Sequence, residues 1–122
     1  MTEEGIRERI DYEIIVDCYD EHEQGMGWIT YLEENMEFPF KARIIEKSRV
    51  SALKVDDIIK VIGIDIDVEP EHFHHAEVEV EKDDRQYFVP LSNIKGIDAD
   101  EETEQAINDW HFWKKEYFKF GN

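Results

Sequence analysis

Residues 11 to 40, DYEIIVDCYDEHEQGMGWITYLEENMEFPF, place apolar residues at helical spacing among many acids, and Pro39 lies near their end. The segment holds nine carboxylates and neither Lys nor Arg. The nine are Asp11, Glu13, Asp17, Asp20, Glu21, Glu23, Glu33, Glu34 and Glu37. Folding of the apolar residues brings these like charges together, so the segment raises the question of what neutralises them.

The apolar spacing predicts a helix over residues 3 to 21, apolar over most of its girth with one narrow acidic stripe. That stripe is formed by Glu13, Asp17, Asp20 and Glu21. Gly25 and Gly27 interrupt the pattern, and a second, short helix is predicted near residues 28 to 36. The same residues are also compatible with an extended segment.

After Pro39 the period changes to that of short strands. Strands are predicted at 40–48, 57–66, 75–83 and 85–91, with a closing turn at 90–96. Residues 100 to 118 read as a helix capped by Asp98 or Asp100. The predicted fold is a single α+β domain over residues 1–122, helical at 3–36, with a β unit at 40–96. That unit is a small antiparallel β-barrel-like or twisted sheet, flanked by N-terminal helices and a C-terminal helix.

The composition restricts the partners. Among 122 residues, 31 acids against 14 Lys and Arg give a net charge of −17, while 12% aromatic residues favour a folded chain. Nucleic acids and anionic membranes are poor partners for such a chain, whereas a cation or a basic protein surface is favoured. A single cysteine and a charged start without a signal-peptide core predict a soluble cytoplasmic protein.

The acidic stripe is the first candidate site. Like charges four residues apart on a helix cost roughly 0.2 to 0.5 kcal/mol per pair. Calcium takes about 6 to 8 oxygen ligands, so it would neutralise such a cluster. Glu33, Glu34 and Asn35 would add oxygens if the chain doubles back at Gly25–Gly27. The alternative is an acidic face that is simply solvated.

Three other patterns in the sequence are candidate metal sites. Asp98, Asp100 and Glu102 resemble the opening of an EF-hand loop with Asp109 at position twelve, but Thr103 stands where the loop needs Gly. A capped helix start explains them better. A shallow ion site could use Asp65, Asp67 and Glu69. The loop residues His72, His74 and His75 could bind zinc or nickel, although a solvated connection is the commoner use of such a loop.

No catalytic arrangement stands out, and the chain is not predicted to be an enzyme. Cys18 lies among Ile and Tyr, as a packed thiol would, and His22 and His111 have no nucleophile suggested by sequence. The aromatic run Trp110–Trp113 is predicted to pack in the core.

Four stretches together resemble the cyanobacterial-type calcium-binding protein family, small acidic proteins associated with calcium buffering during heterocyst development. They are RIDYEIIVDCYDEHEQGMGWITYLEENMEFPF (9–40), ALKVDD (52–57), FVPLSNI (88–94) and DEETEQAINDWHFW (100–113). The chain departs from the family pattern at Gly25, at Asp57 and in the histidine loop.

The resemblance implies calcium binding without an EF-hand, on an α+β fold. Carried onto this chain, the ligand role falls on Asp17, Asp20, Glu21, Glu33, Glu34 and Asn35. These residues are too many for one ion, so two sites are expected. The function implied is a Ca²⁺ buffer or sensor in calcium signalling. The alternatives are an acidic module that docks a basic partner, and a histidine-dependent transition-metal protein or hydrolase.

Overall fold

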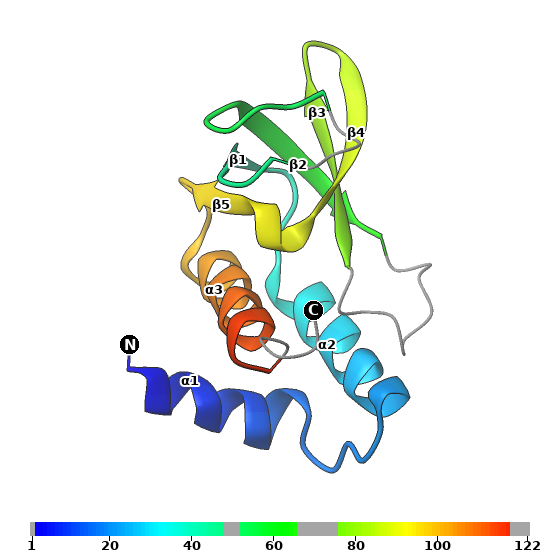
Figure 1. Ribbon diagram of the computed structural model, residues 1–122, viewed down its shortest axis with the longest axis vertical. Coiled ribbons are helices and arrows are strands. Elements are labelled where there is room, and N and C mark those ends of the chain that lie inside the picture. The colour runs from blue at the N-terminus through cyan, green and yellow to red at the C-terminus, as the bar shows by residue number, and fades with distance from the viewer. Residues whose placement is uncertain (1, 48–51, 66–75, 118–122) are drawn as a thin grey trace.

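The computed structural model describes residues 2–47, 52–65 and 76–117, and Figure 1 shows the helices gathered on one side of the sheet. At the N-terminus come α1 (Glu3–Arg9), a π-helical turn η1 (Ile10–Ile14) and α2 (Glu21–Asn35). The sheet comprises β1 (Phe40–Ile44), β2 (Ile58–Ile64), β3 (Glu77–Lys82), β4 (Arg85–Pro90) and β5 (Ile94–Ile97). A 3₁₀ turn, η3 (Leu91–Asn93), precedes β5, and α3 (Glu101–Tyr117) follows it. The predicted α+β class is confirmed.

All strand pairs are antiparallel, in the order β4-β3-β2-β1-β5. Period-2 alternation decides which face is covered: Phe40, Ala42 and Ile44 are buried, whereas Lys41 between them is exposed. One face therefore packs on the helices and the other meets water.

Three tryptophans join α2 to α3 beneath the sheet. The Trp28 ring meets the ring of Trp110 edge-on, with centroids 5.2 Å apart, and lies 5.0 Å from that of Trp113. All three side chains are buried. The expectation that the run at residues 110–113 belongs to the core is confirmed for Trp110 and Trp113, while His111 and Phe112 are half-buried.

The predicted helix over residues 3 to 21 is wrong after Ile14. Residues 15–20 form a connection in which Asp17 has a left-handed φ of 57°, and Asp20 caps a new helix. The Asp20 carboxylate accepts the Glu23 N–H at 2.8 Å, which favours a helix start there over continuation. Tyr12 and Tyr19, which a helix over residues 3 to 21 would place on its apolar side, are 74% and 85% exposed.

Two further boundaries differ from the prediction. The second helix is neither extended nor confined to residues 28–36, because it begins at Glu21 and runs through both glycines, Gly25 and Gly27. The expected closing turn at 90–96 is only partly a turn: residues 94–97 form an edge strand paired with β1, so that Ile94 lies opposite Ile44. Within the described residues, no helix is both long enough and apolar enough to cross a membrane.

Candidate functional site: acidic pairs between elements

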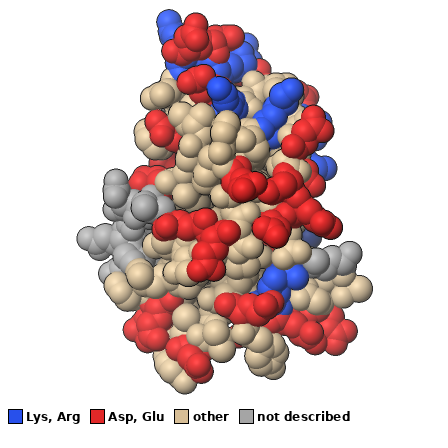
Figure 2. Space-filling model, turned by 180° about the vertical axis from the view of Figure 1, so that it is seen from behind, with Lys and Arg blue, Asp and Glu red and all other residues tan. Residues whose placement is uncertain are grey.

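All nine carboxylates of residues 11–40 are exposed. Figure 2 shows Asp and Glu side chains over most of the lower, helical part of the molecule. Because α2 begins afresh at Glu21, the stripe expected on one helix does not exist: Glu13 is in η1, Asp17 is in the connection and Asp20 is a cap. Water therefore screens most of this charge.

The six residues expected as ligands fall into two groups at opposite ends of α2. Asp17, Asp20 and Glu21 lie at its start, and Glu33, Glu34 and Asn35 at its end. A rise of about 1.5 Å per residue separates the two groups by about 20 Å. The Asn35 amide already donates to the Tyr31 carbonyl oxygen at 2.8 Å. The structure thus brings the six together in two sets and not in one.

A groove between η1 and α2 brings together acids that the sequence places 21 positions apart, Glu13 and Glu34. Its volume is about 290 Å³, and Thr30 and Tyr31 also line it. Gly27 sets the closeness of the two elements, since a Cβ at this position would lie 2.3 Å from the Ile14 carbonyl oxygen. The groove therefore offers two carboxylates and a hydroxyl from two elements.

Cys18 also lines this groove, half-buried, with its Sγ 3.2 Å from the Glu23 carbonyl oxygen. Burial raises the pKa of the Cys18 thiol, and the neighbouring carboxylates, Glu23 first, raise it further. These surroundings favour the neutral thiol over a nucleophilic thiolate, as predicted for a packed cysteine.

Another acidic pair lies between the residues that follow α2 and those that precede α3. The carboxyl groups of Glu37 and Asp100 share a hydrogen bond, which raises the pKa of Glu37, and the Asp100 charge raises it further. Hydrogen bonds from Thr103 lower the pKa of Asp100. Two neighbouring carboxyl groups at the surface form a pair between which a hard cation could bind.

Thr103 fixes the geometry of this pair. Its backbone N–H donates to Asp100 at 2.8 Å, and its hydroxyl oxygen accepts from the Glu37 N–H at 2.9 Å. Thr103 itself is buried, and it anchors the pair through the Glu37 backbone and one Asp100 carboxylate oxygen, while the side chains of Glu37 and Asp100 stay exposed. Of the two predicted caps, Asp98 and Asp100, the structure shows Asp100, whereas Glu37 was not among the predicted ligands.

Within the described residues, no group of three or more His, Cys, Asp or Glu side chains is arranged to hold a metal. Each acidic pair therefore needs further oxygens from water or the backbone to complete calcium coordination. An EF-hand loop starting at Asp98 is excluded, because residues 101–117 form one continuous helix in which Asp109 is buried. The histidines at 72, 74 and 75, with Asp67 and Glu69, lie outside the described residues.

Comparison with known proteins shows the family to which the chain belongs. The family model described as calcium binding, CcbP, matches residues 8–114. The chain belongs to the CcbP calcium-binding family. The crystal structure of CcbP from Anabaena is 38% identical with a TM-score of 0.77, over 93% of this chain and 91% of that one.

A second similar structure is a calcium-binding protein in its calcium-binding form, also 38% identical, with a TM-score of 0.80. That match covers 98% of this chain and 100% of the other. A search of curated protein sequences gives no match. For this CcbP family member, the resemblance seen in the sequence is confirmed and Ca²⁺ is the ion.

Proposed function

We propose that this chain binds Ca²⁺ through exposed carboxylates contributed by separate elements, without an EF-hand loop, and that Glu37 and Asp100 supply the principal pair. The observation that carries the proposal is the direct contact of these two carboxyl groups. Two like charges this close repel each other unless a proton or a metal lies between them. Ca²⁺ favours an all-oxygen set of this kind.

We place a weaker second site along α2. The groove lined by Glu13 and Glu34 runs along α2 from Met26 to Glu34, and the resemblance also implied Glu33 and Asn35 near that last residue. Asp17, Asp20 and Glu21 remain predicted ligands at the other end. The Asp20 carboxylate is already used as a cap, which leaves one of its oxygens for an ion.

We propose that the protein is a calcium buffer. Thr103 holds the Glu37 backbone and one Asp100 carboxylate oxygen, so an ion can bind between the two carboxyl groups without moving either element. A sensor needs a second conformation for the ion to favour. The family's role agrees with a non-enzymatic protein.

Isothermal titration with Ca²⁺, run beside Mg²⁺ and Zn²⁺, tests the site. The variants Glu37→Gln and Asp100→Asn keep the shape of each side chain, and Asn still caps α3. Each variant should weaken calcium binding by about tenfold or more, because losing one charged hydrogen-bonding group commonly costs about 1.5–3 kcal/mol. Glu46→Gln, an exposed acid just after β1, is the matched control. Unchanged affinity in both site variants would move the principal site elsewhere.

A further inference from the structure

The outer face of the sheet carries cations opposite cations. In the register of β1 with β2, Lys41 lies opposite Lys60, and in the register of β1 with β5, Arg43 lies opposite Lys95. Directly opposed side chains share one face with Cβ atoms about 5 Å apart, and like charges there are destabilising. In a chain with 31 acids, pairing each of these cations with an acid would have been the stabilising choice.

Two isoleucines complete the arrangement. Ile97 is the other neighbour of Lys41, and Ile58 is the other neighbour of Arg43. Three adjacent strands thus display four cations and two isoleucines on one face, which we call the cation grid: Lys41, Arg43, Lys60, Lys95, Ile58 and Ile97. Ile58 is 46% exposed. Strand spacing makes the grid about 10 Å wide.

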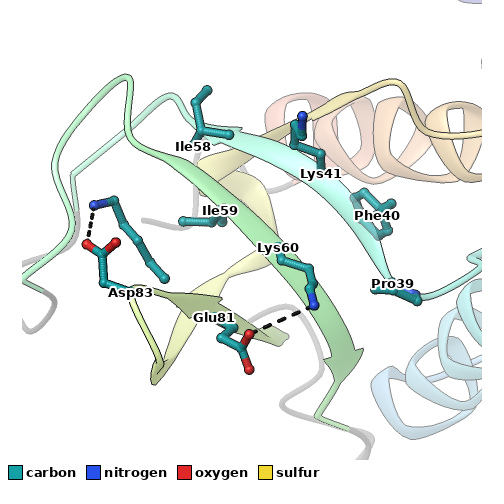
Figure 3. A pocket seen from close by; sticks show the side chains of 9 residues that line it. Pro39, Phe40, Lys41, Ile58, Ile59, Lys60, Glu81 and Asp83 are labelled. Carbon is teal, nitrogen blue, oxygen red and sulfur yellow. Dashed lines mark hydrogen bonds and ion pairs between the residues drawn. The ribbon is translucent and has the colours of Figure 1, made fainter.

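Beside the grid lies a groove with a volume of about 610 Å³. Pro39, Phe40 and Ile58 give it an apolar lining, and three lysines, Lys41, Lys60 and Lys82, border it. Figure 3 shows the grid residues Lys41, Ile58 and Lys60 projecting from neighbouring strands. Such a groove can receive an apolar side chain while the lysines contact acids on either side of it.

Local acids pair with part of this positive charge: Arg43 pairs with Asp56, Lys60 with Glu81 and Lys82 with Asp83, and the last two acids also line the groove. The Lys60 ammonium lies 3.9 Å from the Glu81 carboxylate with both side chains exposed, a geometry worth little in water. Within the described residues, Lys41 and Lys95 form no ion pair. In Figure 2 most visible Lys and Arg side chains lie in the upper part of the molecule, interspersed there with Asp and Glu.

We propose that the cation grid and its groove form a docking surface for an acidic segment of a partner protein, with an apolar side chain seated between carboxylates. The opposed cations of the grid lower the stability of the sheet, and a ligand that supplies negative charge explains why the chain keeps them. The surface lies on the face of the sheet opposite the helices. The inference is therefore independent of the proposed calcium pairs.

A short acidic segment fits better than the larger polyanions. A nucleic acid carries charge continuously along its length, and beyond the grid it would meet Glu81 and Asp83 and a chain of net charge −17. A second copy would bring another −17 to the interface, and docking of its acidic helices here would join two different faces, which leads to open chains of molecules. A segment with a few carboxylates avoids both costs.

The test is an array of labelled ten-residue peptides with varied apolar residues at the centre and either Asp/Glu or Lys/Arg on both sides. Binding to the protein is measured by fluorescence anisotropy in EDTA, so that calcium plays no part. We expect acidic peptides to bind about tenfold or more tightly than their basic counterparts, against the net charge of the protein, and to weaken as salt is raised. Lys41→Glu should abolish this preference, and Ile58→Ser should weaken binding about threefold or more by removing apolar contact.

Lys115→Glu, an exposed charge reversal on α3, is the matched control and should leave peptide binding unchanged. Lys41→Glu should melt at the same or a higher temperature than the original chain, because it removes a like-charge pair; weaker binding then reports lost contact and not unfolding. The proposal is overturned if no acidic peptide binds more tightly than its basic partner, or if Lys41→Glu binds as before. It is equally overturned if single-stranded dT20 binds more tightly than every acidic peptide, or if sedimentation shows self-association that Lys41→Glu abolishes.

Discussion

Arg9 and Asp109 form a two-point ion pair that ties the start of the chain to its last helix. The Arg9 guanidinium donates from Nε and one terminal nitrogen to the two Asp109 oxygens at 2.7 and 2.8 Å. The Tyr31 hydroxyl donates to the same carboxylate at 2.6 Å, so three helical segments meet at one acid. Asp109 is 1% exposed at its side chain and Arg9 is 15% exposed, so the pair is shielded from water.

Asp109→Asn should therefore lower the free energy of unfolding by about 3 kcal/mol or more, because it leaves a shielded guanidinium without its counter-charge. Urea unfolding monitored by tryptophan fluorescence measures the loss, since Trp110 is adjacent in sequence. The matched control is Asp56→Asn. Asp56 pairs with Arg43 at 3.9 Å on the surface, and its loss should cost less than about 1 kcal/mol. Equal effects of the two substitutions would mean that the Asp109 pair is not shielded as described.

At Gly27 the structure reverses the usual effect of a glycine-to-alanine substitution on stability. In the interior of an exposed helix, Gly→Ala usually stabilises by about 0.5–1 kcal/mol. Here the added Cβ would lie 2.3 Å from the Ile14 carbonyl oxygen, a backbone atom that cannot swing aside. Gly27→Ala should therefore lower the melting temperature by several degrees, a loss of about 1–3 kcal/mol from overpacking.

Gly63→Ala is the control, because a Cβ at Gly63 in β2 meets no atom within 4 Å. It should leave the melting temperature unchanged or raise it slightly, since alanine lowers the entropy of the unfolded chain. A Gly27→Ala protein as stable as the original would show that η1 can move away from α2. The groove lined by Glu13 and Glu34 would then be adjustable in width.

The fold was predictable where it depends on local pattern, and unpredictable where it depends on distant partners. The strands predicted at 75–83 and 85–91 correspond to β3 and β4, and the two predicted caps of the last helix, Asp98 and Asp100, included the observed one, Asp100. The end of the first helix was missed because the apolar period continues through Val16, which tertiary packing leaves 46% exposed.

The candidate site shows the same division. Sequence indicated that acids would crowd together, and calcium followed from their number and from the family resemblance. It could not indicate that Glu37 meets Asp100, because they are separated by 62 intervening residues and meet only after α3 packs against α2. Nor could it reveal the cation grid, since the opposition of Lys41 and Lys60 depends on strand register.

His111 should make stability fall in mildly acidic solution. Burial lowers the pKa of His111 from its ordinary value of 6.5, although the carbonyl groups of Leu91 and Ile94 oppose the shift. The unfolded chain therefore takes up a proton near pH 6.5 while the folded chain resists it. The contribution of neutral His111 to the free energy of unfolding is complete above pH 6.5. It is lost as pH falls below that value towards the folded-state pKa, at up to about 1.4 kcal/mol per pH unit.

Urea unfolding at pH 7.5, 6.5 and 5.5 measures this loss. His111→Gln should flatten the dependence in that range, whatever its effect on absolute stability. His22→Gln, at an exposed position, should leave the dependence as it was. A slope that survives in His111→Gln would assign the proton uptake to another group.

Calcium binding should compete with protons at a higher pH than an isolated glutamate would allow. Contact with Asp100 raises the pKa of Glu37 above its ordinary value of 4.5, and Ca²⁺ requires the ionised carboxylate. Lowering the pH from 7 towards 4.5 should therefore raise the calcium Kd, and binding there should release protons. Titrations in two buffers with different ionisation enthalpies count the protons released.

The contribution of this carboxyl pair to the stability of the calcium-free protein should change much less over the same range, because the two shifts act in opposite directions. The raised pKa of Glu37 gives a contribution that is lost as pH rises, and the lowered pKa of Asp100 gives one that is lost as pH falls. Saturation with Ca²⁺ at about 100 times Kd should add about 2.7 kcal/mol at neutral pH, seen as a higher melting temperature than in EDTA. Asp100→Asn should remove most of that rise together with the proton release, whereas Glu46→Gln should preserve both. The calcium-induced rise in melting temperature and the number of protons released could both be unchanged in Asp100→Asn. That result would show that the ion binds away from this pair and that the protonation of Glu37 has no part in calcium binding.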